Sequence, residues 1–205
     1  MYAAVAAEAS IREAWDRCDY PVAATRTLEA FGPGILGYLA ARLGNEWDGR
    51  EAFSEFVEDF WRGLPDFQWR CPVRAWAYCL ARHAAARLES SPQRRPGHNL
   101  PLSEISEVAA SVLRARTTTL PHERSEVKDR LRELRARLPE VEQSLLVLRV
   151  DKRLSWRELA VVLSEEEGTL EQAELEREAA RLRKRFQLVK EKLRKMIAAE
   201  GLSRD

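Results

Sequence analysis

The sequence predicts an all-α protein built as two small helical domains joined by a linker. Apolar residues recur at steps of three and four through most of the 205 residues, which is the pattern of helices that bury one face. No segment shows an equally strong alternation of apolar and polar residues, the pattern of a half-buried β-strand. The segment Ser90–Pro101, SSPQRRPGHNLP, separates two helical halves and has the proline-rich composition of a linker.

The first half carries three predicted elements. Pro33 favours a helix that begins near this residue rather than at Leu28, because proline is tolerated in the first turn of a helix and disrupts its interior. A broad apolar stripe predicts a helix over Glu51–Leu64. Pro65 then begins a loop, and helical spacing resumes over Val73–Leu88.

The linker and the start of the second half are less regular. Ile105–Arg116 has the pattern of a marginal helix inside the linker, and the threonines and proline after it end this helix. A strongly charged helix is predicted over Ser125–Leu138, and another begins at Pro139. The predicted parts of the chain are an N-terminal extension (1–24), a first domain (25–89), a linker (90–124) and a second domain (125–205).

Two capping boxes mark the starts of the last two helices. Ser155 with Glu158 precedes the short helix Trp156–Leu163, and Thr169 with Gln172 is the candidate cap of the last helix. The apolar stripe of that helix consists of Leu175, Ala179, Leu182, Phe186, Val189, Leu193 and Ile197. Its length predicts one continuous helix of up to about 30 residues.

Charge is distributed unevenly along the chain. The formal net charge is only +1, but Asn45–Asp66 holds seven acidic and two basic residues, whereas Arg177–Lys195 holds nine basic and two acidic residues. A partner meets the local charge rather than the average. The two segments are therefore expected to bind partners of opposite charge.

The cysteine content and the lack of long apolar runs indicate the cellular compartment and argue against membrane insertion. The three cysteines, Cys18, Cys71 and Cys79, cannot all pair within the chain, so a reducing cytoplasm is expected. No apolar run approaches the roughly 18 residues of a membrane span, so no membrane insertion is expected, and the first residues lack the pattern of a signal peptide. Cys79 and His83 lie one helical turn apart, but two potential ligands make a weak metal site. We predict ordinary packing for them, no metal and no cofactor.

The acidic segment contains a recognisable motif. DGREAFSEF, Asp48–Phe56, resembles the DAEDLVQETF helix in region 2 of extracytoplasmic-function (group IV) sigma factors, subunits of bacterial RNA polymerase in the sigma-70 family. In that family the helix docks on a coiled coil of the polymerase β′ subunit. The resemblance assigns polymerase binding to Asp48, Glu51, Ser54, Glu55 and Glu58. The three glutamates share one helical face, and an ordinary solvated acidic face is the alternative interpretation.

The next segment resembles the part of region 2 that recognises the −10 element. DFQWRCPVRAWAY, Asp66–Tyr78, matches a loop and the helix after it. A base pulled from the duplex needs a planar platform, and Trp69 is the candidate because its loop position is not needed for the helical stripe. Trp76 is expected to pack in the core. The −10 site implied by the resemblance consists of Asp66, Gln68, Trp69, Arg70, Arg74, Arg82, His83 and Arg87. His83 stands where the family often has asparagine, which leaves polar contacts at that position open.

The second half resembles region 4 of the same family. LPEVEQSLLVLRVDKRLSWRELAVVL, Leu138–Leu163, matches the first part of its helix-turn-helix, and Leu182–Leu193 matches its recognition helix. Arginine and lysine on such a helix read guanine edges or hold phosphates in the major groove. The implied −35 site consists of Ser155, Trp156, Arg157, Arg181, Arg183, Lys184, Arg185, Gln187 and Lys190. A basic amphipathic helix also suits a membrane surface or another protein, but its place after a capped short helix favours DNA.

The chain departs from the family between these two helices. A helix-turn-helix turn usually has three or four residues, whereas about 18 residues, seven of them Glu, separate Leu163 from Leu182. This Glu-rich insertion (164–178) is either a helical extension that projects away from DNA or an acidic flap that screens the basic helix.

The sequence thus predicts a sigma factor that binds core RNA polymerase, at its β′ coiled coil and β flap, and promoter DNA at the −10 and −35 elements. An anti-sigma factor or other inhibitory protein is a further candidate partner. The alternative is a stand-alone helix-turn-helix regulator with an N-terminal interaction module. No GxxxxGK, HExxH or nucleophile-elbow motif points to an enzyme.

Overall fold

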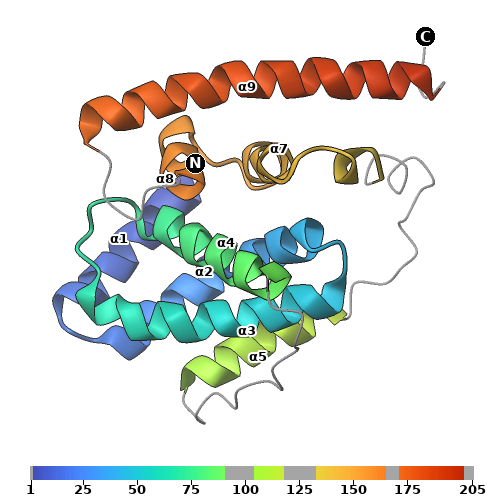
Figure 1. The fold of residues 1–205 in the computed structure, drawn as a ribbon. Coiled ribbons are helices and arrows are strands. Elements are labelled where there is room, and N and C mark those ends of the chain that lie inside the picture. Colours follow the sequence, from blue (N-terminus) through green and yellow to red (C-terminus); the bar gives the residue numbers. More distant parts are fainter. Residues whose placement is uncertain (1, 91–103, 118–132, 165–170, 201–205) are drawn as a thin grey trace. The chain divides into compact units, whose positions relative to one another are not determined.

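The computed structural model describes residues 2–90, 104–117, 133–164 and 171–200. Within these ranges the regular secondary structure is helical throughout, which confirms the predicted all-α class. The chain divides into two compact units, residues 1–119 and 120–205 (Figure 1). This division falls inside the predicted linker (90–124), and the helix of that linker belongs to the first unit.

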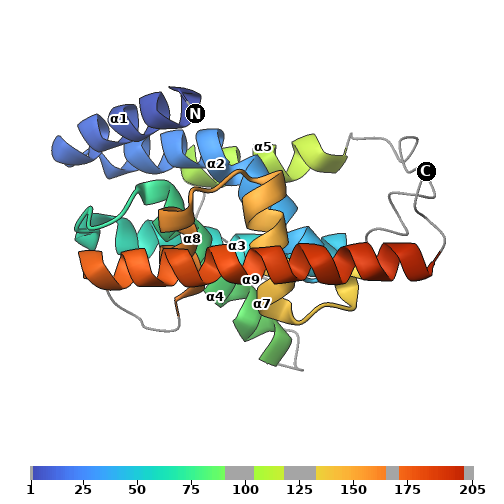
Figure 2. The same ribbon diagram turned by 90° about the horizontal axis from the view of Figure 1, so that it is seen from above.

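The first unit is built around its second helix. Its elements are α1 (Tyr2–Asp16), α2 (Tyr20–Arg42), α3 (Glu46–Gly63), the short 3-10 helix η1 (Leu64–Asp66), α4 (Val73–Ser90) and α5 (Glu104–Thr117). Helix α2 packs against α1, α3, α4 and α5, and α1 lies beside it (Figure 2). Buried aromatic and aliphatic side chains fill the centre, among them Leu28, Ile35, Tyr38, Phe53, Phe56 and Phe60.

Helix α2 runs without interruption through Pro33, so the prediction that a helix begins near Pro33 is wrong. The side chain of Pro33 is exposed, while Phe31, Ile35 and Leu36 around it are buried. Burial of residues on both sides of the proline outweighs the lost backbone hydrogen bond. The helix begins instead at Tyr20, where the Asp19 carboxylate accepts a hydrogen bond from a backbone N–H of the first turn.

Helices α3 and α4 agree with the predicted elements. Helix α3 starts five residues before the predicted Glu51, because Asn45 caps it by accepting the backbone N–H of Asp48. A methyl group at Gly49 would lie 2.8 Å from the Cα of Ala40, so a residue without a side chain lets α2 and α3 approach closely. Helix α4 covers the predicted range.

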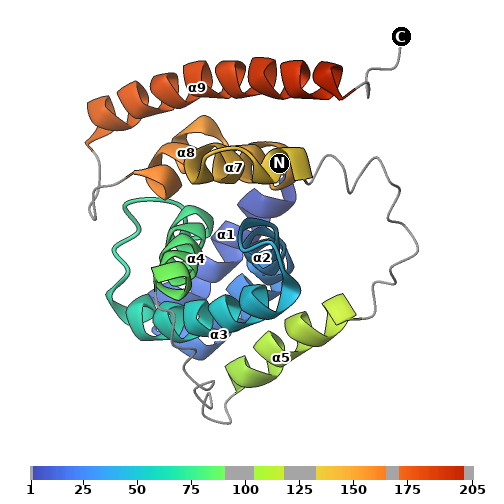
Figure 3. The same cartoon turned by 45° about the vertical axis from the view of Figure 1, so that its right-hand side comes forward.

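Helix α5 confirms the marginal helix predicted over Ile105–Arg116 and shows where it packs. Ala109 and Val112 are buried, and the Val112 side chain lies over Gly32 of α2. Figure 3 shows α5 beside α3. This part of the predicted linker therefore contributes to the first unit's core.

The second unit contains α7 (Glu140–Leu146), which continues as the π-helical turn η3 (Val147–Asp151), followed by α8 (Trp156–Leu163) and α9 (Gln172–Ala199). Leu138, Leu146 and Val189 form a buried cluster, against which Phe186, Leu193 and Met196 pack. Leu134 and Leu138 are buried, while most of the predicted helix Ser125–Leu138 falls outside the described residues.

The last two helices have clear starts. The capping box of Ser155 and Glu158 is confirmed. Helix α9 has 28 residues, close to the predicted length, but its capping box is formed by Glu171 and Glu174 rather than by Thr169 and Gln172. The Glu171 carboxylate takes the place that the threonine hydroxyl was expected to fill. No helix within the described ranges is long and apolar enough to cross a membrane.

Candidate partner and nucleic-acid interfaces

Helix α3 presents the predicted acidic face. Its inward side consists of Gly49, Ala52, Phe53, Phe56, Val57 and Phe60, all buried. At 100° per residue, Glu51, Glu55 and Glu58 lie opposite that side, and each is half-buried. The prediction that they share an outward face is therefore consistent with how α3 packs.

The residues of the predicted polymerase site differ in whether another side chain or backbone group of the chain already binds them. Arg87 of α4 donates to the Glu55 carboxylate over 3.4 Å and also pairs with Asp59. Asp48 accepts a hydrogen bond from the Asn45 amide at 2.6 Å, and the Ser54 hydroxyl donates to a backbone carbonyl one turn earlier. Glu51 and Glu58 have no ionic or hydrogen-bond partner among the described residues.

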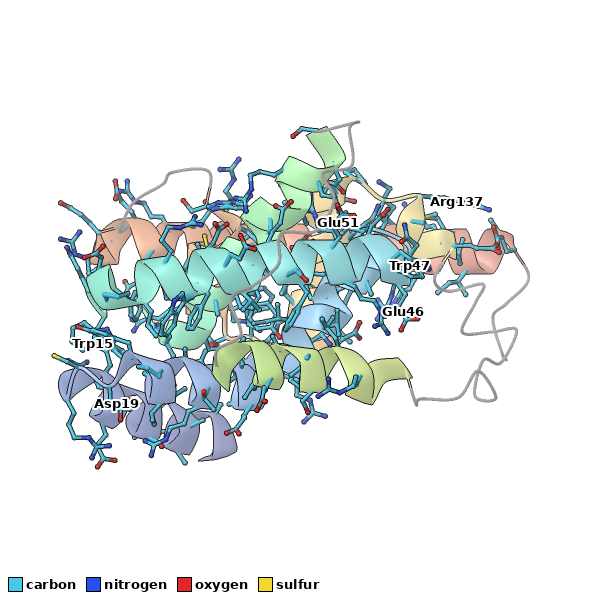
Figure 4. The ribbon with its side chains drawn as sticks, turned by 90° about the horizontal axis from the view of Figure 1, so that it is seen from below. Trp15, Asp19, Glu46, Trp47, Glu51 and Arg137 are labelled. Carbon is cyan, nitrogen blue, oxygen red and sulfur yellow. The ribbon has the colours of Figure 1, made fainter. Side chains whose placement is uncertain are left out.

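The same outward side carries two tryptophans that lie outside the predicted sites. Trp47 is 83% exposed and Trp61 is 37% exposed. Trp47 lies four residues before Glu51, and Trp61 lies three residues after Glu58. This spacing places both tryptophans on the same helical face as the glutamates and can be read from the sequence. Figure 4 shows Trp47 and Glu51 together near one end of α3, with Trp15 and Asp19 near the other end of the unit.

The predicted −10 loop is held by an aromatic cluster. Phe67 stacks on Trp76 with ring centroids 4.5 Å apart and an interplanar angle of 16°, and Trp76 also lies 5.0 Å from Phe60. Trp76 therefore packs on the core side, as predicted. Trp69 continues the cluster at 5.1 Å from Phe67.

Helix α1 contributes two further contacts to Trp69. The Arg12 guanidinium lies 5.0 Å from the centre of the Trp69 ring, and Trp15 meets the ring edge-on at 6.0 Å. Trp15 in turn donates its indole N–H to the carbonyl of Leu64 at 2.8 Å. Trp69 has a φ of +53°, which bulky residues rarely adopt. Its buried indole N–H meets no acceptor in the described part of the chain. Trp69 is thus half-buried, and only part of its ring is accessible to a base.

Helix α1 also caps α4. The Glu8 carboxylate accepts the backbone N–H of Val73 at 3.1 Å and that of Arg74 at 2.9 Å, a favourable place for an anion at a helix N-terminus. Burial raises the pKa of the nearby Cys71 thiol to about 11, with smaller contributions from Cys79 and Glu8. The start of α4 is therefore fixed by a residue from the segment predicted as an extension.

The remaining residues of the −10 site differ in accessibility. Asp66, Gln68 and Arg70 are exposed in or beside the loop, whereas Arg74, Arg82 and His83 are half-buried. An Nη atom of Arg82 lies 3.3 Å from Nε2 of His83, and Cys79 Sγ lies 3.9 Å from the same nitrogen. Arg87 is held by α3, as described above. The loop side therefore offers the more accessible polar groups.

In the second unit, Trp156 connects α8 to α9. Its ring meets Phe186 edge-on at 5.6 Å, with the Arg149 guanidinium 4.5 Å and the Arg183 guanidinium 5.9 Å from its centre. These contacts orient α9 and one of its predicted DNA-binding arginines. Trp156 is half-buried, and Ser155 is occupied as a helix cap.

The first two turns of α9 belong to the predicted Glu-rich insertion, and they are continuous with the recognition helix. Residues 164–171 separate α8 from α9, of which 165–170 lie outside the described residues. The part of the insertion from Gln172 onward is therefore helical, as the interpretation of a helical extension expects. Glu176 pairs with Arg157 at 2.9 Å, and Glu178 lies 3.7 Å from Arg181. Two predicted DNA-binding arginines thus already have carboxylate partners.

Helix α9 carries several accessible polar and cationic side chains. Lys184 and Arg181 are exposed, and so is Gln187, while Arg185 is half-buried. Lys190 lies 5.3 Å from the Phe186 ring centre. Lys184, Arg185, Arg194 and Lys195 have no carboxylate partner among the described residues. The inward side buries Ala179, Leu182 and Val189.

Within the described ranges, no group of three potential metal-binding side chains comes together. The Cys79–His83 pair therefore has no third candidate ligand in the described residues. No protein-family model matches this chain, and neither a curated protein nor a solved structure is significantly similar to it.

Proposed function

We propose that this chain is an extracytoplasmic-function-type sigma factor, which binds core RNA polymerase and directs it to promoters. In this role the first unit binds the β′ coiled coil and the strand opened at the −10 element. The second unit binds duplex DNA at the −35 element and the β flap. The protein acts in the cytoplasm without a cofactor.

One observation carries the proposal: each predicted surface is left outward-facing by the packing of its own unit. Helix α3 buries its phenylalanines and presents outward Glu51 and Glu58, which have no partner in the part of the chain that the structure describes. Helix α9 buries its apolar stripe and presents the exposed Lys184 away from it, with the half-buried Arg185 beside the stripe. An acidic helix in one unit and a basic helix in the other suit a protein and a nucleic-acid partner, respectively.

The structure also supports a helix-turn-helix arrangement in the second unit. Helix α8 is short, firmly capped and packed against α9; Arg183 of α9 lies over Trp156 of α8, while Lys184 and Gln187 are exposed. Such a helix can lie in the major groove, with arginine and lysine reaching base edges and phosphates.

Co-purification with bacterial core RNA polymerase tests the proposal. Glu51→Lys combined with Glu58→Lys should abolish binding, because reversed charges on an interface cost several kcal/mol. Glu29→Lys is the matched control, since Glu29 is exposed on α2. The helical circular dichroism of all variants should be unchanged. A wild-type chain that binds promoter-like duplexes but never core polymerase would instead identify a stand-alone DNA-binding regulator.

A further inference from the structure

Helix α1 contacts the predicted −10 loop at three places along its length. Trp15 donates its indole N–H to the carbonyl of Leu64, directly before the loop. The Arg12 guanidinium lies over the ring of Trp69, in the middle of the loop. The Glu8 carboxylate accepts the first backbone N–H groups of α4, where the loop ends. A segment predicted as an N-terminal extension therefore holds the loop at its start, middle and end.

The three contacting residues of α1 share one helical face. Glu8, Arg12 and Trp15 follow one another at steps of four and three, so at 100° per residue they fall within a sector of about 60°. The two outer contacts are hydrogen bonds of half-buried side chains, whereas the middle contact is made by an exposed arginine. Arg12 also pairs with Asp16, but at 3.9 Å and with both side chains 56% exposed, which makes this ion pair weak. The middle contact is therefore the one that can open while α1 stays in place.

Trp69 is held in an unfavourable conformation beneath this contact. Its φ of +53° lies in the left-handed region, which bulky residues rarely adopt. Its buried indole N–H has no acceptor in the described ranges, so the cost of removing this donor from water is not offset. The ring centre lies 5.1 Å from that of Phe67, 6.0 Å from that of Trp15 and 5.0 Å from the Arg12 guanidinium. Strained residues persist only where their surroundings hold them, and they are concentrated in ligand-binding and switching segments.

We propose that the Arg12 guanidinium covers Trp69 in the free chain, so that the ring must be uncovered before a base can stack on it. Stacking needs the face of an aromatic ring. Arg12 lies over this ring, and Phe67 and Trp15 pack around it. Because Arg12 is exposed, its side chain can turn into water while the Glu8 and Trp15 contacts keep α1 in place. The inference rests on the proposed function and adds a covering contact, made by the chain itself, that regulates its −10 site.

Oxidative footprinting of the free full chain, read at Trp69 by peptide mass spectrometry, tests the cover without DNA or polymerase. Arg12→Ala should raise the oxidation rate of Trp69 about two- to fivefold, because losing a cation–π contact at an exposed site shifts the balance between covered and uncovered ring by that factor. Arg17→Ala is the matched control, since Arg17 is also 56% exposed and paired with a carboxylate four residues away. Both variants should keep the helical circular dichroism of the wild type. Equal oxidation of Trp69 in the two variants overturns the cover.

Binding of fluorescent oligothymidylate to the full chain, measured by anisotropy, tests the consequence for stacking, which tolerates any base. Compared with Arg17→Ala, Arg12→Ala should bind about two- to fivefold more tightly. This difference should vanish when Trp69→Ala is added to both variants. Weaker binding of Arg12→Ala than of Arg17→Ala would overturn the cover and make Arg12 a direct DNA contact.

The two measurements separate this inference from the proposed function. If Trp69→Ala weakens DNA binding while Arg12→Ala and Arg17→Ala behave alike in both measurements, the predicted −10 site stands and only the cover fails. If Arg12→Ala raises the oxidation of Trp69 but DNA binding does not depend on Trp69, the cover stands and the −10 role given to this loop by the proposed function fails.

Discussion

Neutralising Glu176 should tighten DNA binding by releasing Arg157. The two side chains form an ion pair at 2.9 Å, and Arg157 belongs to the predicted −35 site. The pair lines a hollow with Ala179 and Arg183, which places Arg183 beside the same carboxylate. A DNA phosphate that approached these arginines would have to displace Glu176.

The size of the expected gain in DNA affinity follows from the solvent exposure of Arg157 and Glu176. The side chains are 61% and 58% exposed, so water and salt screen their attraction strongly. Exposed ion pairs typically contribute about 0.2–1 kcal/mol, and this range corresponds to a gain in affinity of roughly 1.4- to 5-fold for Glu176→Gln. The gain should fade as salt rises, because the screening length is about 10 Å at 0.1 M.

Fluorescence anisotropy on a −35 duplex across a salt series, with Arg157→Ala as the second mutation of a double-mutant cycle, measures this effect. If Glu176 acts by holding Arg157, the gain from Glu176→Gln should disappear in the Arg157→Ala background. An equal gain in both backgrounds would mean that Glu176 repels DNA directly. No gain at low salt would refute the idea that this part of the Glu-rich stretch competes with DNA.

Three further predictions concern the first unit. Gly49→Ala should lower the free energy of unfolding of the first unit by about 1–3 kcal/mol, because the added methyl group would lie 2.8 Å from the backbone of Ala40. Thermal unfolding measures this loss, and an unchanged melting temperature would show that α2 and α3 separate freely. Glu8→Gln should cost about 1 kcal/mol by weakening the cap of α4, and an equally stable variant would remove α1 from that role. Cys71 should be alkylated more slowly than the exposed Cys18 at pH 8. Burial raises the pKa of Cys71 from 9.0 to about 11, so the reactive thiolate is roughly 100-fold scarcer. The alkylation rate of Cys71 should rise about tenfold per pH unit until the pH reaches that pKa. Equal alkylation rates for Cys71 and Cys18 at pH 8 would contradict the raised pKa of Cys71.

Helices with a one-sided apolar pattern could be predicted from the sequence because their signal is local. The stripe from Leu175 to Ile197 predicted α9 nearly to its observed length, and Ser155 with Glu158 marked the start of α8. Pro33 misled the prediction for α2, since a local preference was overridden by burial on both sides of the proline. The cap of α9 was misplaced by two residues because glutamate is not a usual capping residue.

Parts of the candidate sites depend on contacts between distant residues, which spacing does not reveal. Glu55 belonged to the predicted polymerase face, but its partner Arg87 is 32 residues away on another helix. The environment of Trp69 includes Arg12 and Trp15 from a segment predicted as a mere extension. The exposed Trp47, by contrast, was visible from its spacing to Glu51 and was overlooked because the acidic residues alone defined the motif.

Transcription with purified core RNA polymerase tests the central claim most directly. Run-off reactions on a genomic promoter library should give discrete transcripts only when the wild-type chain is added. The Glu51→Lys, Glu58→Lys double variant should give none, although its second unit still binds DNA. Transcripts that do not depend on the chain, with a chain that binds DNA but not core polymerase, would contradict the assignment as a sigma factor.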